Sequence, residues 1–172
     1  YVVSKGTIDE AVTRLREDSF PAGVNAIVFL LHKPVGLGSQ QQVLRADDPK
    51  VKEFLSLACA GGHRYKIGFD SCTIPGLVAQ SSEINMDSVD TCEGGRWSAY
   101  ITANMKMLPC SFDNQQQRWA VDLRNHTIQE AWDSPVFEEF REHFRRSCPE
   151  CEYRQACMGG CPICPEIVLC DK

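Results

Sequence analysis

Residues 148–164 read CPECEYRQACMGGCPIC, and this stretch decides how the C-terminal part of the chain folds. Its spacing is Cys-x2-Cys-x5-Cys-x3-Cys, with two further cysteines at Cys164 and Cys170. A Cys-x2-Cys pair lets two thiolates approach one metal centre from a tight turn. Gly159 and Gly160 let the backbone pass where a Cβ would obstruct a bulky inorganic core. The stretch therefore indicates a segment that folds around metal.

The distribution of the ten cysteines favours metal binding over disulfides. Residues 1–58 contain no cysteine although their pattern is that of a segment with its own core, whereas disulfides usually staple domains that lack a core. An all-thiolate zinc site could use the array, but its x5 and x3 gaps differ from the usual paired zinc knuckles. Spacing alone leaves zinc open and favours iron–sulfur clusters.

The N-terminal part has the pattern of parallel α/β architecture. Residues 25–31 predict a strand buried on both faces, and residues 66–69 predict a second buried strand. Between them, Asp48 and Pro49 are suited to the N-cap and first position of a helix. Strand, helix and strand at this spacing predict parallel pairing. A capping box at residues 7–10 predicts an earlier helix.

After residue 72 the pattern becomes that of a small α+β domain, and we place the domain boundary between residues 85 and 86. The expected domains are therefore 1–85 and 86–172. A β-hairpin is predicted around Asn104, which tolerates the left-handed conformation of such turns. The predicted elements are strands at 98–101, 106–108 and 119–123, and helices that begin at a capping box at 127–130 and at 134–135. The aromatic residues expected in the core are Trp97, Trp119, Trp132, Phe137, Phe140 and Phe144.

Charge and hydropathy exclude two classes of partner. The net charge is −5 and no basic run stands out, so we expect no nucleic acid to bind. The longest apolar run, residues 26–31, is too short to cross a membrane. The chain begins without Met and without the features of a signal peptide. We expect the later part of a longer, cytoplasmic protein.

The spaced cysteines resemble the SPASM domain of radical SAM enzymes. That family has a hairpin between two cysteines, then the array quoted above, then one last cysteine. Cys92 and Cys110 match the hairpin pair, and the resemblance covers roughly residues 90–170. The family has a glycine where this chain has Met105, and we expect Asn104 to supply the positive φ instead.

The resemblance implies two auxiliary 4Fe–4S clusters with interleaved ligands. The ligands implied for the first cluster are Cys72, Cys92, Cys110 and Cys161. Those implied for the second are Cys148, Cys151, Cys157 and Cys170, with Cys164 as the alternative last ligand. Without Cys72, the first cluster would have an open iron site for a substrate atom. Cys59 is expected to be a core residue, since it lies on the apolar side of a helix.

Residues 1–72 resemble the second half of the partial (β/α) barrel of radical SAM enzymes. The expected fold class is thus α/β, with the C-terminal part of a partial barrel followed by a small Cys-rich α+β domain. Barrel enzymes place their chemistry at the carboxyl ends of the strands, where residues 32–36 and 68–72 would lie. Asp70 is the catalytic candidate there, and it would either contact substrate or cap the next turn. His32 is expected to be satisfied structurally.

The N-terminal part lacks the Cys-x3-Cys-x2-Cys loop that holds the radical SAM cluster. That spacing recurs at residues 157–164, but inside the other motif. We therefore expect S-adenosylmethionine to be used only together with an N-terminal radical SAM half. The resemblance implies a maturase that abstracts hydrogen from a peptide or protein substrate, with the clusters relaying electrons or contacting that substrate. The alternatives are a non-catalytic iron–sulfur electron-transfer module and a zinc-stabilised binding domain.

Overall fold

The computed structural model describes residues 1–80, 91–146, 148, 150–157 and 159–170. The chain forms a mixed α/β structure that divides into two compact units. The first unit comprises Tyr1–Asp90 and Cys164–Lys172, and the second comprises Thr91–Ile163. The boundary predicted between residues 85 and 86 lies outside the described residues, so that division stays a prediction. No helix in the described ranges is long and apolar enough to span a membrane.

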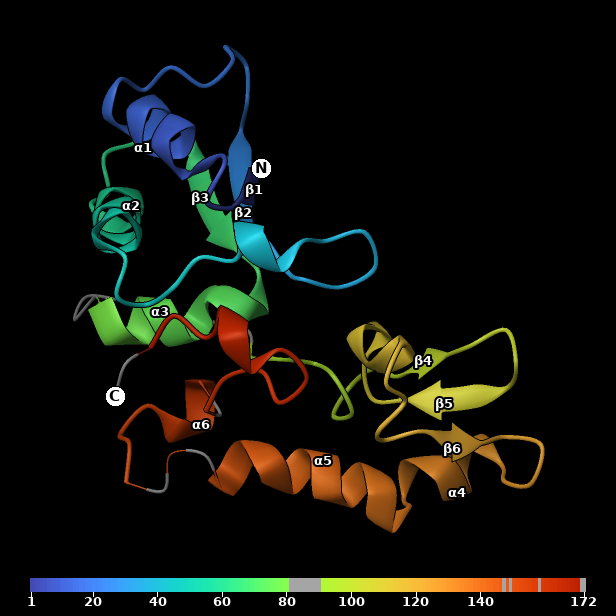
Figure 1. Cartoon of the computed structure of the whole chain (residues 1–172). Coiled ribbons are helices and arrows are strands. Elements are labelled where there is room, and N and C mark those ends of the chain that lie inside the picture. Colours follow the sequence, from blue (N-terminus) through green and yellow to red (C-terminus); the bar gives the residue numbers. More distant parts are fainter. Residues whose placement is uncertain (81–90, 147, 149, 158, 171–172) are drawn as a thin grey trace. The chain divides into compact units, whose positions relative to one another are not determined.

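The first unit is built on a parallel sheet (Figure 1). Its strands run in the order β1 (Val2–Val3), β2 (Ala26–Leu31) and β3 (Lys66–Phe69). Ile27 of β2 lies opposite Ile67 of β3, so the predicted parallel pairing of the two apolar runs is confirmed. The third strand of the sheet, β1, was not predicted from the sequence, because a strand of two residues shows no hydrophobic periodicity.

Helices α1 (Ile8–Arg16) and α2 (Pro49–Cys59) lie on the same side of this sheet (Figure 1). Phe29 of β2 is buried there, and its ring centroid lies 4.9 Å from that of Phe54 in α2. Val28 and Leu30 point to the other face and are 49% and 43% exposed. Because side chains alternate along the strand and helices cover one face, the prediction that both faces of β2 are buried is wrong for the described structure.

The two predicted helix starts in this unit differ in their caps. Asp48 caps α2 as predicted, since its carboxylate accepts a hydrogen bond from the Lys50 backbone N–H at 2.9 Å. At α1 the predicted capping box is wrong. The Thr7 hydroxyl makes no cap and instead donates to the Val2 carbonyl at 2.8 Å, while the Glu10 carboxylate accepts from the Tyr1 hydroxyl at 2.8 Å.

The C-terminal tail packs within the first unit. The remaining elements of this unit are η1 (Gln40–Gln42), η2 (Ser71–Thr73), α3 (Ile74–Gln80) and η5 (Pro165–Ile167). Ile167 and Leu169 are fully buried, and a Cβ on Gly76 of α3 would lie 2.8 Å from the Leu169 Cβ. The Gln40 side chain also donates to the Glu166 carboxylate at 2.6 Å. Tail and α3 therefore fit together only because residue 76 has no side chain.

The second unit contains an antiparallel sheet in the order β4 (Tyr100–Ile101), β5 (Lys106–Leu108) and β6 (Val121–Asp122). The predicted hairpin and third strand are thus confirmed. Met105 itself has a φ of 63°, so the expectation that Asn104 supplies the positive φ is wrong. The turn keeps the left-handed conformation at the position of the family's glycine, with a side chain that makes it strained.

Helices α4 (Ile128–Trp132), α5 (Pro135–Arg146) and α6 (Arg154–Cys157) follow the sheet, and η4 (Ser111–Asn114) precedes β6. The capping box of Thr127 with Glu130 is confirmed by reciprocal hydrogen bonds. One core cluster joins the sheet to the helices through Met107, Val121, Ala131 and Phe137. Trp119 is buried as expected, but Trp97 is 76% exposed, so its predicted place in the core is wrong. The Phe144 side chain lies outside the described part.

Candidate metal centre

Two cysteines from separate segments are brought together by the loop after Cys92. The backbone N–H of Gly95 donates to the carbonyl of Pro109 at 2.8 Å, which ties this loop to the end of β5, directly before Cys110. Between the two thiols lies Gly94, where an added Cβ would stand 3.6 Å from the Cys92 Sγ and 3.4 Å from the Cys110 Cβ. A residue without a side chain therefore leaves the space beside both cysteines open.

A third thiol, from the tail array, joins this pair. Burial raises the pKa of Cys92, and the nearby thiols of Cys161 and Cys110 raise it further. Burial likewise raises the pKa of Cys110, to which Cys161 again adds. Such effects between thiols weaken with distance and are screened beyond about 10 Å. Cysteines from the loop, the strand end and the tail therefore lie near one another in the second unit.

Hydrogen-bond donors and one cation face these sulfurs. The backbone N–H of Gly94 and the positive charge of Arg96 act to lower the pKa of Cys92. Arg96 is held close, since its Nη1 donates to the Cys92 carbonyl at 3.3 Å. The backbone N–H of Phe112 lowers the pKa of Cys110 in the same way. These groups favour the thiolate form, which is the form that binds metal.

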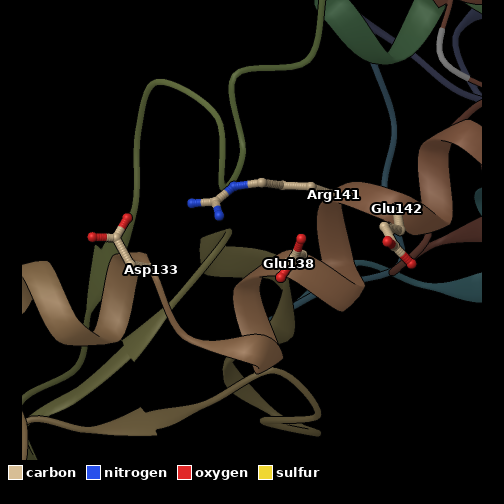
Figure 2. Close-up of a pocket in the computed structure, with 4 residues that line it drawn as sticks. All are labelled: Asp133, Glu138, Arg141 and Glu142. Atoms are coloured by element: carbon tan, nitrogen blue, oxygen red, sulfur yellow. The ribbon is translucent and has the colours of Figure 1, made fainter.

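The loop after Cys92 is anchored to α5 by Arg141. Its Nε donates to the Gly95 carbonyl at 2.6 Å and its Nη2 donates to the Trp132 carbonyl at 2.8 Å. Its guanidinium carbon also lies 4.8 Å from the Trp132 ring centroid. Figure 2 shows Arg141 reaching from α5 toward the loop, beside a surface pocket of about 260 Å³. The pocket is lined by Asp133, Glu138, Arg141 and Glu142.

Two aromatic rings, Trp119 and Phe140, pack beside the same loop, and we call this pair the aromatic wall. The ring centroids of Trp119 and Phe140 lie 5.1 Å apart at 77°, and Cys92 packs against this pair. Gly95 has a φ of +64°, and an added Cβ would lie 2.9 Å from the Phe140 Cδ1 and 3.0 Å from the Pro109 Cβ. Both the backbone conformation and the packing therefore require glycine at this position.

The rest of the tail array forms turns that present partly buried thiols. The backbone N–H of Cys151 donates to the Cys148 carbonyl at 3.4 Å, which closes the tight turn expected of a Cys-x2-Cys pair. Cys157 is the last residue of the short helix α6. Gly159 and Gly160 follow with φ of 83° and 86°, in the left-handed region that a side chain disfavours.

The remaining cysteines belong to the first unit. Cys72 is partly buried in η2, directly after β3, and Cys164 is buried next to η5. Cys170 follows the buried Leu169, and Cys59 ends α2, where burial raises its pKa. The expected roles of Cys72 and Cys170 as ligands, and of Cys164 as the alternative, stay predictions.

Asp70 lies at the carboxyl ends of β2 and β3, where the sequence predicted it. Its carboxylate forms an ion pair with Lys33 and accepts hydrogen bonds from the Leu31 backbone N–H at 3.2 Å and the Thr73 hydroxyl at 2.8 Å. Its side chain is therefore engaged with the turn and with the neighbouring strand end. His32 is also satisfied, since its Nε2 lies 3.0 Å from the Ser39 carbonyl. The sequence analysis placed residues 32–36 at this edge but did not single out Lys33, although a cation two residues after a strand was the available signal.

The donor set suits a cluster better than a single ion. None of the ten cysteines, all of which are described, forms a disulfide. Among the described residues, no three His, Cys, Asp or Glu side chains are close enough to bind one metal ion. A cluster spreads its thiolates over several irons and so accepts sulfurs that are farther apart than the ligands of one tetrahedral zinc. The roles of Cys92, Cys110 and Cys161 as ligands of such a cluster stay predictions.

Comparison with known proteins agrees with this chemistry. Residues 92–158 match the model of the SPASM family, described as an iron-sulfur cluster-binding domain. The match covers less than half of the chain, and it includes Cys92 and Cys110 but ends before Cys161. No curated protein and no solved structure matches the chain. Residues 92–158 are thus similar to the SPASM iron–sulfur cluster-binding domain.

Proposed function

We propose that this chain is the auxiliary-cluster part of a radical SAM maturase that modifies a peptide or protein after translation. It would carry two 4Fe–4S clusters and act with an N-terminal radical SAM half in the reducing cytoplasm. The observation that carries the proposal is the convergence of Cys92, Cys110 and Cys161 in a segment that includes the match to the SPASM family. If these three thiols lay far apart, they could not bind the same cluster.

We assign the cysteines of the second unit to two clusters. Cys92, Cys110 and Cys161 would hold the first cluster, and Cys148, Cys151 and Cys157 would provide thiolates for the second. The clusters, when bound, would accept and pass on single electrons. Arg96 stabilises the thiolate of Cys92 through its positive charge.

The aromatic wall of Trp119 and Phe140 would keep water from one side of the centre. Cys92 packs against these two buried rings, so that side of its sulfur faces apolar groups. Burial and hydrogen bonds to the sulfurs are the two means by which a protein sets a cluster's potential. This unit provides both, through the rings that pack against Cys92 and through the backbone N–H groups of Gly94, at Cys92, and Phe112, at Cys110.

The first unit would contribute part of the partial barrel. The exposed apolar side chains of Val28 and Leu30 support this, because the inner face of a barrel strand is apolar and is covered only in the closed sheet. Asp70 and Lys33 would lie at the end of the sheet where barrel enzymes place their substrates. A substrate group that displaces Lys33 from this pair would meet a carboxylate that is already oriented.

Iron content in cysteine variants tests the proposal. We expect Cys110→Ala and Cys161→Ala each to lose about half of the iron of the anaerobically purified protein, because each removes a ligand of the same cluster. The double variant should lose no more than either single variant. Combining Cys110→Ala with Cys148→Ala should remove nearly all of the iron. Cys59→Ala is the matched control, and its iron content should equal that of the wild type.

Two results would contradict the proposal. Unchanged iron in Cys110→Ala would show that this thiol binds no cluster, and zinc in place of iron would support the zinc-stabilised binding domain. Anaerobic reconstitution of the full-length protein, with and without its N-terminal segment, tests the enzyme hypothesis separately. Reductive cleavage of S-adenosylmethionine by the full-length protein would exclude the electron-transfer module.

A further inference from the structure

The outer edge of β4 presents backbone groups that the sheet does not use. Antiparallel pairs alternate between residues that exchange hydrogen bonds and residues that do not. The backbone N–H of Thr102 donates to the Lys106 carbonyl at 2.9 Å, so the pair of Ile101 with Met107 is a non-hydrogen-bonded one. The N–H and C=O of Ile101 therefore point away from β5. Among the described residues, no strand pairs with this edge.

Apart from its short length of two residues, this edge lacks protection against pairing. Edge strands are normally guarded by short length, by charged side chains, by proline or by a bulge. Residues 98–105 read SAYITANM and contain neither a charged residue nor a proline. The opposite edge of the same sheet is guarded, because β6 ends in Asp122, which forms an ion pair with Arg124. The two edges thus differ in how open they are to a further strand.

The side chains around the open edge are large, apolar and exposed. Tyr100 and Ile101 of β4 are 39% and 44% exposed and point to opposite faces of the sheet. The edge is also joined to the thiol-bearing loop, since the Ser98 carbonyl accepts a hydrogen bond from the Gly95 N–H at 2.9 Å. A chain added at β4 would therefore be held by a strand that continues from the loop of Cys92.

We propose that the edge of β4 binds an extended, uncharged segment of the polypeptide substrate by strand addition. Hydrogen bonds to the N–H and C=O of Ile101 hold its main chain, and Tyr100 and Ile101 contact its side chains from the two faces. A second copy of this chain fits less well, because stable dimers bury more than about 1,000 Å² and this strand spans two residues. Short pairing gives weak, reversible binding, which suits a substrate that must leave. The inference rests on the proposed function.

Replacing Ile101 with proline tests the outer edge of β4 without removing a hydrogen bond of the hairpin. Proline lacks the N–H that points outward, and the pairing with β5 does not use that N–H. The I101V variant keeps the N–H and is the matched control. The I101K variant keeps the backbone and adds the missing charge, so it tests the edge even if I101P does not fold.

A phage-displayed library of random linear peptides, selected on the anaerobically purified chain, is the probe. We expect the enriched peptides to be uncharged and rich in β-branched residues. They should bind I101V like the wild type, and bind I101P and I101K roughly tenfold more weakly, since each loses or obstructs a main-chain hydrogen bond. Tryptophan fluorescence shows whether each variant is folded.

Equal binding to all four proteins, or no enrichment on the wild type, would overturn the inference. A wild-type dimer that becomes a monomer in I101K would also overturn it, in favour of a second copy. Iron measured on the same preparations keeps the two claims apart. Wild type that holds iron but shows no selective peptide binding refutes the strand-addition site alone, whereas wild type without iron refutes the proposed function.

Discussion

Replacing Gly95 with alanine should destabilise the second unit for two separate reasons. Gly95 has a φ of +64°, and an alanine in that conformation costs about 1–2 kcal/mol. Its Cβ would also stand 2.9 Å from a Phe140 ring carbon and 3.0 Å from the Pro109 Cβ, and such overpacking costs about 1–3 kcal/mol. The free energy of unfolding of this unit should therefore fall by about 2–5 kcal/mol.

Urea unfolding of the anaerobically purified protein measures this change. All three tryptophans lie in the second unit, so their fluorescence reports on that unit. For an m value of 1–3 kcal/mol per molar, we expect the midpoint to fall by roughly 1 M or more. Iron content should fall as well, because the displaced loop carries Cys92.

Met105→Gly is the matched control for the conformational cost. It removes a side chain from a residue with a φ of 63° in the same unit, and it relieves no clash that involves Gly95. We expect it to stabilise the unit by about 0.5–1 kcal/mol, after the entropy lost by glycine. A Gly95→Ala midpoint within error of the wild type would refute the packing of the loop against Phe140.

Three further predictions concern other contacts. Arg141→Met should lower the free energy of unfolding of the second unit by about 2–4 kcal/mol and reduce its iron content, because two charged hydrogen bonds to carbonyls are lost. Arg141→Lys reaches fewer carbonyls, so its stability and iron content should lie between those of wild type and Arg141→Met. Equal values for Arg141→Met and wild type would contradict the anchoring of the loop by Arg141. Leu169→Ala should cost the first unit about 2–5 kcal/mol, seen as faster proteolysis of the tail with unchanged tryptophan fluorescence. Removing iron with a chelator should lower the urea midpoint reported by tryptophan, since metal binding is coupled to folding; an unchanged midpoint would mean that the second unit folds without metal.

Local patterns predicted the parts of the fold that depend on neighbours in sequence. Asp48 caps its helix as expected because the residues that it needs follow directly. The capping box at Thr127 forms for the same reason. The box at Thr7 has the same pattern and fails, because its hydroxyl oxygen accepts from the Ser4 backbone N–H at 2.9 Å, directly after β1, instead of from the helix. A two-residue strand that sequence periodicity does not reveal thus decides a contact at the start of α1.

Features that depend on distant residues could not be predicted in this way. The burial of Leu169 in the first unit depends on the missing side chain at Gly76, more than ninety residues earlier. The anchoring of Gly95 by Arg141 joins a loop to a helix that no periodicity connects. The SPASM resemblance could be predicted from the spacing of the cysteines alone, whereas their roles as ligands stay predictions. The groups around them, such as Arg96, could not be predicted.

The iron and acid-labile sulfide content of the anaerobically purified chain tests the central claim most directly. Converging thiolates that hold two 4Fe–4S clusters predict iron and sulfide in equal amounts, about eight of each per chain. Zinc without iron, or iron without sulfide, would contradict the account, because the same thiols would then bind single ions.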